Sequence, residues 1–410
     1  MKKSYESKVL HKSFERPDVY HSIAMPVYHS VAFEFDSAEA MEDAFLNRST
    51  DHTYSRITNP TVQHFEQKVQ EITRAYSVTA LNSGMAAISN TFMEIAYAGA
   101  NIVTSAHLFG NTFSILNYTL KEFGVETRFC DLTNPEDVRK NIDENTCCLF
   151  LEIITNPQLE VADLSMLSSI CKEKKIPLIA DTTIIPFHVF DAKSVGVDIE
   201  LVSSTKYISG GATSTGGLII DYGTFDWSYS KRLKSMAEKV GNAAFKAKLR
   251  LEIHRNIGAY MTPQTAHLQL LGLETLALRY EKQAATALSL AKALEESTIF
   301  EYVNYIGLPS NPFHTISKKQ FGNSYGAMLT IDLASRKEAF HFLNHLKLIR
   351  RATNLFDNRS LAIHPASTIY GTLSAEQRKA MDVSDKTVRL SVGLEGMEDL
   401  LEDILQAVQR

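Results

Sequence analysis

Short apolar segments alternate with helical patterns between residues 78 and 221, and this alternation constrains the fold more than any other feature. Seven segments have the composition of strands: 78–81, 101–105, 125–130, 146–154, 178–181, 201–204 and 217–221. Helical patterns such as 164–174 separate most of them. Strands and helices that alternate at this spacing predict an α/β domain built on a doubly wound, mostly parallel sheet of seven strands.

The sequence pattern differs before and after this alternation of strands and helices. Residues 1–60 lack strong periodicity and are predicted to form an extended arm. After residue 225 the chain shows long helical patterns at 245–262 and 268–297, strand patterns at 327–333 and 387–391, and a helical pattern at 336–346. We therefore expect the arm at 1–60, a large domain at 61–260, and a linker helix with a smaller C-terminal α+β domain at 261–410.

Composition excludes several classes of function. The formal net charge is −5 and no basic run stands out, so neither a nucleic acid nor an anionic membrane surface is an expected partner. No segment approaches the ~18 consecutive apolar residues of a membrane span. The charged N-terminus lacks the apolar stretch of a signal peptide. The four cysteines form no CxxC pair and no metal-ligand spacing, so we expect a cytoplasmic protein without a metal site.

Ligands of doubly wound sheets bind beyond the carboxyl ends of the strands, so polar residues there are candidate site residues. Lys206 follows one predicted strand, directly after Ser203, Ser204 and Thr205. At a buried strand end the pKa of a lysine falls, and part of the amine becomes neutral and nucleophilic. The hydroxyls of Ser203 and Thr205 would bind an anion such as phosphate. A solvated lysine in a loop of Ser and Gly residues fits this stretch equally well.

Two other strand ends carry candidate ligand groups. The small-residue turn at 82–87 opens a helix and presents free backbone N–H groups to an anion, without a GxGxxG or Walker pattern. Asp181 ends a buried strand, where a carboxylate needs a partner. That partner is a helix cap, a salt bridge, or the protonated ring nitrogen of pyridoxal phosphate. In the last case, a lysine 25 residues later would hold the cofactor's aldehyde.

Tyr54 and Arg56 stand two residues apart before the Asn59–Pro60 turn signal. In an extended segment their side chains point to the same side. A tyrosine hydroxyl and a guanidinium placed in this way would clamp a phosphate. An ordinary pair of surface residues explains the pattern as well.

Eight separated motifs, in order and over nearly the whole chain, resemble the Cys/Met-metabolism pyridoxal-phosphate enzymes of fold type I. They are YSRITNPT (54–61), SGMAA (83–87), LFGNT (108–112), EIITNP (152–157), ADTT (180–183), SSTKY (203–207), IHPAS (363–367) and VRLSVGLE (388–395). Agreement across eight motifs makes the loop reading of Lys206 untenable.

The resemblance implies pyridoxal 5'-phosphate (PLP) as cofactor and a role for each matching residue. Lys206 would carry PLP as a Schiff base and later move protons, while Asp181 would keep the pyridinium nitrogen protonated. The ring would stack on Phe109, with Asn156 near the phenolic oxygen. The other implied cofactor residues are the phosphate ligands Gly84, Met85, Ser203 and Thr205, the adjacent Ser83 and Thr183, and Tyr54 and Arg56 from the neighbouring subunit.

The resemblance also implies a substrate site and an assembly. Arg389 would grip the α-carboxylate of a small amino-acid substrate in a bidentate fork. The other substrate-binding residues that the resemblance implies are Asn354, Asn156 and Tyr54. A neighbour that supplies Tyr54 requires a homo-oligomer, and the family suggests a tetramer made of two catalytic dimers.

Three stretches are most similar to the O-acetylhomoserine sulfhydrylase branch: NIGAYMTPQTA (256–266), GLETLALR (272–279) and NLFD (354–357). This similarity implies γ-replacement, in which O-acetylhomoserine and sulfide or a thiol give homocysteine or methionine, and acetate. The alternatives are a cystathionine γ-synthase or a methionine γ-lyase and, more remotely, a non-catalytic PLP-binding protein. Asn111 argues against the lyase, which usually carries a cysteine there. The sulfur donor stays open.

Three residues depart from the family pattern. Phe109 replaces a common tyrosine and can stack on a ring but cannot transfer a proton; acetate, as a good leaving group, needs little help from an acid. Phe356 replaces a usual glycine, and Tyr370 stands where a histidine is frequent. We expect Phe356 and Tyr370 to reshape the substrate pocket.

Overall fold

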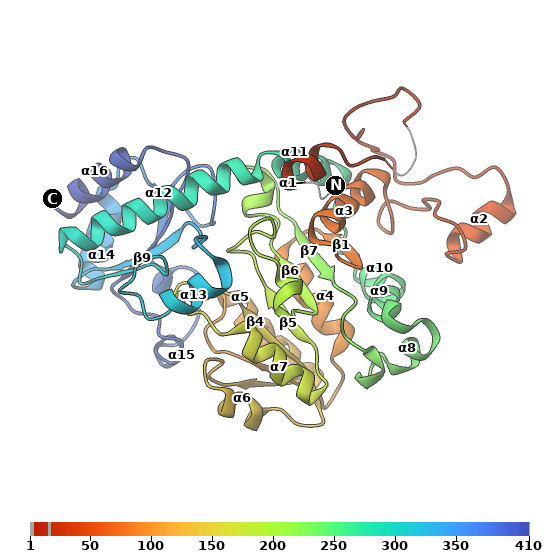
Figure 1. The fold of residues 1–410 in the computed structure, drawn as a ribbon, viewed down its shortest axis with the longest axis horizontal. Coiled ribbons are helices and arrows are strands. Elements are labelled where there is room, and N and C mark those ends of the chain that lie inside the picture. The colour runs from red at the N-terminus through yellow and green to blue at the C-terminus, as the bar shows by residue number, and fades with distance from the viewer. Residues whose placement is uncertain (1–3, 15–17, 410) are drawn as a thin grey trace.

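The computed structural model describes residues 4–14 and 18–409, and a seven-stranded sheet forms the centre of its larger part (Figure 1). The strands are β1 (Ser77–Leu81), β2 (Asn101–Thr104), β3 (Glu126–Phe129), β4 (Thr146–Glu152), β5 (Leu178–Asp181), β6 (Ile199–Val202) and β7 (Gly217–Asp221). Their order is β1-β7-β6-β5-β4-β2-β3. β7 runs antiparallel to both neighbours and all other pairs are parallel. The predicted mostly parallel sheet is confirmed.

Both faces of this sheet are buried. Along β4, Cys148 and Phe150 pack into one hydrophobic core, whereas Leu149 and Leu151 pack into the other. Successive side chains of a strand point to opposite faces, so a strand covered on both sides reads as a continuous apolar run. Because both faces are buried, these strands appear in the sequence as apolar runs, and they could be predicted from it for this reason.

Five helices of the larger part (α3, α4, α6, α7 and α11) begin at a capping residue whose side chain accepts a backbone hydrogen bond. Asn59 accepts a hydrogen bond from the Thr61 N–H at the start of α3, and Ser83 accepts one from the Ala86 N–H at the start of α4. The helices are α3 (Pro60–Thr73), α4 (Gly84–Ile95), α5 (Gly110–Ser114), α6 (Pro135–Asn141), α7 (Leu164–Lys174), α8 (Lys234–Val240), α9 (Ala244–Lys248), α10 (His254–Ile257) and α11 (Pro263–Glu274).

The long helix α12 (Leu276–Ser297) runs from the larger part to a second, five-stranded sheet (Figure 1). The strands are β8 (Tyr302–Asn304), β9 (Met328–Asp332), β10 (Arg350–Arg351), β11 (Leu361–Ile363) and β12 (Thr387–Ser391), in the order β10-β11-β12-β9-β8. The helices beside it are α13 (His314–Phe321), α14 (Arg336–His345), α15 (Ala375–Ala380) and α16 (Met397–Val408). The expected smaller α+β unit is confirmed.

Several helices differ from their predicted form. The arm contains the short helices α1 (Tyr5–Leu10) and α2 (Ala38–Phe45), and α2 lies on a segment that extends away from the body (Figure 1). A π-helical turn at Leu249–Ile253 interrupts the helix predicted at 245–262, and Gly258 ends it at a φ of 71°. The helix predicted at 268–297 is two helices that meet at Thr275.

Among the helices of the described residues, none combines the length and the apolar character that crossing a bilayer requires. Met1–Lys3, on which the expectation of no signal peptide partly rests, lie outside these residues.

Candidate active site

A cavity of about 250 Å³ lies where the carboxyl ends of β4, β5 and β6 meet the start of α4 and residues of the second sheet. It therefore occupies the place that a doubly wound sheet offers to a ligand. Twelve of the fourteen predicted site residues line it: Ser83, Gly84, Met85, Phe109, Asn156, Asp181, Thr183, Ser203, Thr205, Lys206, Asn354 and Arg389. Their roles remain predictions, but the structure brings these twelve together.

The start of α4 supplies backbone donors to the cavity. The first N–H groups of a helix have no partner within the helix, and the helix dipole makes this end positive. A Cβ built on Gly84 would lie 2.7 Å from the Ser203 Cβ, so only glycine lets the helix start approach the end of β6 this closely. The backbone N–H groups of α4 and the Ser203 hydroxyl thus converge on one anion-sized space.

Two threonine hydroxyls in the cavity wall already have partners. The Thr205 hydroxyl donates to the Gly216 carbonyl at 3.2 Å and accepts from the Gly216 N–H at 3.0 Å. The Thr183 hydroxyl accepts from the Ser203 N–H at 2.8 Å. Thr205 must therefore redirect its proton to donate to a phosphate. Ser204 is fully buried and is not part of the lining, which agrees with the strand alternation.

Two carboxyl groups share the floor of the cavity, at paired positions of neighbouring strands: Glu152 on β4 and Asp181 on β5. The Thr183 N–H donates to Asp181 Oδ1 at 2.9 Å, and Glu152 Oε1 accepts from the Phe109 N–H at 2.7 Å. Burial raises the pKa of Asp181, while Thr183 and the charge of Lys206 oppose the rise. Burial and the neighbouring Asp181 raise the pKa of Glu152 well above its ordinary value. We assign the proton to Glu152 and the negative charge to Asp181.

The Lys206 amine lies in the cavity wall and donates to Asn354 Oδ1 at 2.6 Å. Burial and the nearby positive charge of Arg389 lower the pKa of Lys206 to about 8, against the opposing effect of Asp181. A substantial neutral fraction near neutral pH follows, as a nucleophilic amine requires.

Arg389 supplies a buried positive charge on β12, with only 3% of its surface exposed. Its Nη1 donates to Asn156 Oδ1 at 3.2 Å, and its Nη2 donates to the Asn354 carbonyl at 2.9 Å. Burial lowers the pKa of Arg389 to about 10. Its Nε has no partner among the residues that the structure describes. A buried donor without a partner in a cavity wall marks a place for an anionic ligand group.

Neither Phe356 nor Tyr370 lines the cavity, contrary to the expectation that both reshape it. Tyr370 is fully buried, and its hydroxyl lies 2.9 Å from the Leu108 carbonyl and also bonds to the Asn156 carbonyl. It therefore acts on the pocket through the backbone beside Phe109 and Asn156. Phe356 is likewise fully buried.

Tyr54 and Arg56 do not reach this cavity within their own chain. The Arg56 guanidinium lies 5.6 Å from the centre of the Tyr54 ring and bonds to the Arg255 carbonyl. Tyr54 is 40% exposed, and Arg56 lines a separate surface cavity of about 520 Å³. Their predicted role in a neighbouring subunit's site remains a prediction.

Eight further residues line the cavity and were not among the predicted site residues: Ile88, Thr112, Glu152, Ile154, Ile184, Thr353, Leu355 and Ile369. Glu152 carried a usable signal, because it is a carboxylate at a strand end within the EIITNP stretch. The others come from helix interiors or from loops, where sequence pattern gives no sign of which cavity a side chain faces.

The residues of this cavity fit PLP. A carboxylate, a desolvated amine, an aromatic ring and a helix start are the groups that a pyridinium, an aldehyde, an aromatic ring and a phosphate require. The family profile described as Cys/Met metabolism PLP-dependent enzyme matches residues 6–409. The chain belongs to this family. It is therefore a PLP-dependent enzyme of fold type I.

Relatives and solved structures agree with this family. O-acetyl-L-homoserine sulfhydrylase 1 of Thermus thermophilus is 35% identical, over 98% of this chain and 99% of its own. The crystal structure of a putative O-acetylhomoserine (thiol)-lyase from Campylobacter jejuni, which contains a pyridoxyl-lysine phosphate, has a TM-score of 0.92 at 31% identity and covers 99% of this chain and 100% of its own. An O-acetylhomoserine sulfhydrylase of Wolinella succinogenes, described as acting in methionine biosynthesis, is 44% identical with a TM-score of 0.77, over 86% of this chain and 98% of its own.

Proposed function

We propose that this enzyme catalyses γ-replacement: it converts O-acetylhomoserine and sulfide to homocysteine and acetate, or, with a thiol such as methanethiol, to methionine. The observation that carries the proposal is one desolvated amine, Lys206, in the same cavity as one fully buried guanidinium, Arg389. An amino-acid substrate needs both, because its α-carboxylate and the proton on its α-carbon must be held at fixed places.

The chemistry divides between cofactor and chain. PLP, when bound, withdraws electrons from the substrate's α-carbon. Lys206 accepts the proton from that carbon and helps to move a proton at the next one, for which a pKa of about 8 is suitable. Arg389 orients the substrate carboxylate, and Asn354 and Asn156 hold Arg389 in place.

The nature of the leaving group follows from Phe109. A phenylalanine beside the ring cannot protonate a departing group, so a substrate that leaves as acetate suits this cavity better than one that must leave as a thiol. The names of the relatives point to the same substrate. Thr112 and the apolar side chains of Ile88 and Ile369 line the same cavity.

The roles of the predicted site residues form part of this proposal. Asp181 pairs with the pyridinium, supported by Thr183, and Phe109 stacks on the ring. Asn156 lies near the phenolic oxygen. The phosphate is held by Gly84, Met85, Ser203 and Thr205, with Ser83 adjacent, and by Tyr54 and Arg56 of a neighbouring subunit, with Tyr54 also facing the substrate.

We also propose that the chain has three parts: an arm at residues 1–60, a large PLP-binding domain at 61–260, and a linker helix with a small C-terminal domain at 261–410. The arm's Tyr54 is exposed and does not line the chain's own cavity, which supports a homo-oligomer in which arms are shared. The family resemblance suggests that it is a dimer of dimers. Four free thiols, at Cys130, Cys147, Cys148 and Cys171, support a reducing compartment such as the cytoplasm.

The test is product analysis with the purified, PLP-loaded enzyme. O-acetylhomoserine is offered with sulfide, with methanethiol, with cysteine, or alone, and the products are separated by chromatography. We expect homocysteine and acetate with sulfide. Cystathionine as the main product would reassign the enzyme as a cystathionine γ-synthase, and an oxo acid formed without any thiol would reassign it as a lyase. No visible absorption after PLP addition would indicate a non-catalytic protein.

A further inference from the structure

The segment 353–357, in the cavity wall, has a backbone that its residues rarely adopt. The φ angle is 130° at Asn354 and 57° at Phe356. Both values lie in the region that favours glycine, and a bulky residue at such an angle is an outlier. Strain of this kind persists only where the surroundings fix the backbone, and it is concentrated at functional sites. The sulfhydrylase branch that this chain resembles typically has glycine in place of Phe356, and glycine would adopt a φ of 57° without strain.

The Phe356 ring is fixed against the residue that follows Lys206. It stacks on the ring of Tyr207 with 4.0 Å between centroids and 9° between planes. Tyr207 is itself held edge-on by Tyr280 of α12, at 5.1 Å and 76°. All three rings are buried. The stack therefore joins the segment 353–357 to the turn that carries the lysine.

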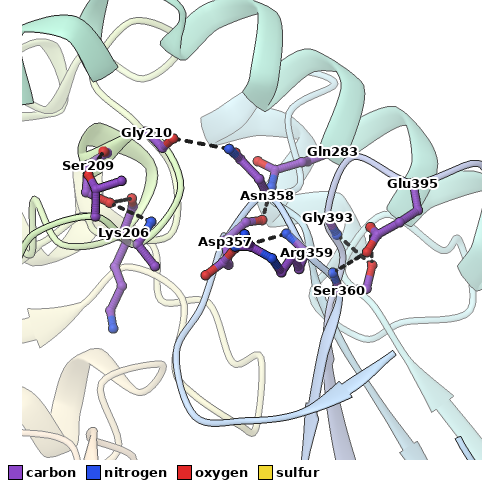
Figure 2. A network of polar contacts seen from close by, with 12 residues as sticks. Lys206, Ser209, Gly210, Gln283, Asp357, Asn358, Arg359, Ser360, Gly393 and Glu395 are labelled. Carbon is purple, nitrogen blue, oxygen red and sulfur yellow. Dashed lines mark hydrogen bonds and ion pairs between the residues drawn. The ribbon is translucent and has the colours of Figure 1, made fainter. Parts of the chain in front are cut away.

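Polar contacts reinforce this joint (Figure 2). The Asn358 side chain donates to the Gly210 carbonyl at 3.1 Å, and Gln283 of α12 donates to the Asp357 carbonyl at 2.7 Å. A Cβ built on Gly211 would lie 2.5 Å from Asn358 Nδ2, so glycine is needed for this approach. The loop after Lys206 and the residues after Phe356 thus form one connected unit.

On its cavity side the same segment holds both functional side chains. Asn354 accepts from the Lys206 amine through Oδ1 and from the Arg389 guanidinium through its carbonyl, at 2.6 and 2.9 Å. The Phe356 N–H donates to Ser391 Oγ at 2.7 Å. Ser391 stands two residues after Arg389 on β12, and so on the same face of the sheet.

We propose that Phe356 is a positioning residue: its stack on Tyr207 locks the segment 353–357 and thereby fixes the Lys206 amine relative to the Arg389 guanidinium. The inference rests on the proposed function only in assigning Arg389 to the substrate carboxylate. Lys206 must reach the proton on a carbon that Arg389 holds through the adjacent carboxylate. A shift of about 1 Å in their separation is enough to cost up to ~100-fold in rate.

The test compares Phe356→Leu with Phe342→Leu, a matched loss of a buried ring that contacts Phe300 in the second unit. In Phe356→Leu we expect kcat/KM for the amino acid to fall roughly 10- to 100-fold at unchanged PLP affinity. Hydrogen–deuterium exchange across 353–358 should rise in both the cofactor-free and the PLP-loaded protein. Phe342→Leu should leave both readouts unchanged.

A double-mutant cycle with Tyr207→Leu tests whether the two rings act as one unit. We expect the double variant to lose no more than the more strongly affected single variant. Losses that multiply, or exchange across 353–358 that stays as in the wild type, would overturn the proposal. Phe356→Met, whose unbranched and flexible side chain fills irregular space more readily, replaces Phe356→Leu if the latter does not fold. If the wild type forms no homocysteine, the proposed function fails, but the exchange comparison still decides on Phe356.

Discussion

Lys206 is the residue whose chemistry the cavity changes most. Burial and the charge of Arg389 bring its pKa down to about 8, while Asp181 acts in the opposite direction. An unperturbed lysine titrates near 10.4. We therefore predict that acylation of Lys206 in the cofactor-free protein rises through pH ~8, as followed by mass spectrometry of the labelled peptide, with exposed lysines as the internal reference.

Charge removal tests the two causes of this shift. Arg389→Gln should raise the pKa of Lys206, because a nearby positive charge disfavours the ammonium form. Asp181→Asn should lower it further. A labelling midpoint near that of the exposed lysines in the wild type, or equal midpoints in the two variants, would contradict the prediction.

The protonation state of Glu152 can also be tested. Because burial and Asp181 raise the pKa of Glu152 well above its ordinary value, we expect it to be neutral. Glu152→Gln keeps a neutral acceptor for the Phe109 N–H and should leave PLP affinity nearly unchanged at pH 7. Glu152→Ala leaves that N–H unpaired and should cost about 1–3 kcal/mol of unfolding free energy in denaturant titrations. A large loss of PLP affinity in Glu152→Gln would mean that the carboxylate is charged.

The sequence predicted most of the residues that line the cavity, partly for a physical reason and partly through the family resemblance. Asp181 ends β5 and Lys206 follows β6, where a polar side chain is conspicuous against an apolar run. Most of the others, such as Asn156 and Arg389, were implied only by the resemblance of their motifs to the family. The role of Thr183 as a support for Asp181, and the engagement of Thr205 with Gly216, depend on hydrogen bonds across the fold. Such bonds leave no local pattern in the sequence.

At the scale of elements, His107 joins three segments beside the cavity. It lies between β2 and α5, with Nδ1 3.0 Å from Glu160 after β4 and Nε2 3.0 Å from Asp382 after α15. The Gln158 side chain also donates to the Met381 carbonyl at 2.5 Å. The end of α15 is thus tied to the loop that carries Phe109.

The contacts of His107 predict how the stability of the protein depends on pH. Burial alone would lower the pKa of His107, but its bonds to Glu160 and Asp382 outweigh burial, and the pKa is raised. The stability that His107 adds is therefore present below its unfolded value of ~6.5 and is lost as pH rises through the higher folded value. Asp382 is largely exposed, so we expect only ~1 kcal/mol.

The measurement is urea unfolding of the wild type and His107→Gln across the pH range 5–9. The difference in unfolding free energy should be largest at low pH and should shrink at high pH. A difference that grows with pH, or that does not depend on pH, would contradict the assignment. Lys319→Gln, which removes an exposed ion pair with Asp163, is the control and should change little.

The elements themselves were predicted to different degrees. The strands at 178–181, 217–221 and 387–391 have the predicted ends, because the first two are mainly apolar runs of strand length and the third alternates polar and apolar residues. The break at Thr275 and the π-helical turn at Leu249–Ile253 were not foreseen. Helical spacing continues through both, and only tertiary packing interrupts the helix there.

At the scale of the whole molecule, the two sheets meet at the cavity. The larger sheet carries Asp181 and Lys206 at its strand ends, and the smaller one carries Arg389 on β12. If the proposed roles are right, the cofactor's pyridinium and aldehyde are held by the larger unit and the substrate carboxylate by the smaller one, and the two units are held together by α12 and by the stacked rings of Phe356 and Tyr207. A change in their relative position is expected to affect substrate use before it affects PLP binding.

Subunit complementation tests the shared site at this scale. Lys206→Ala removes the amine from a subunit's own cavity, whereas Arg56→Ala removes a group that we assign to the neighbour's cavity. In a mixed dimer, one site then lacks both the Lys206 amine and the neighbour's Arg56 side chain, and the other site keeps both groups. Co-expression of two variants that are each inactive should restore roughly a quarter of the wild-type activity, since half of randomly formed dimers are mixed and each has one intact site.

The control pairs two residues of the same cavity. Lys206 and Asp181 line the same chain's cavity. When Lys206→Ala is mixed with Asp181→Asn, every site therefore lacks one of these two groups, and activity should stay absent. Native mass spectrometry confirms that mixed oligomers form in both experiments. If mixed oligomers of Lys206→Ala and Arg56→Ala form and remain inactive, Arg56 serves its own chain's site. The arm would then have to move toward that cavity from the surface position it occupies beside Arg255.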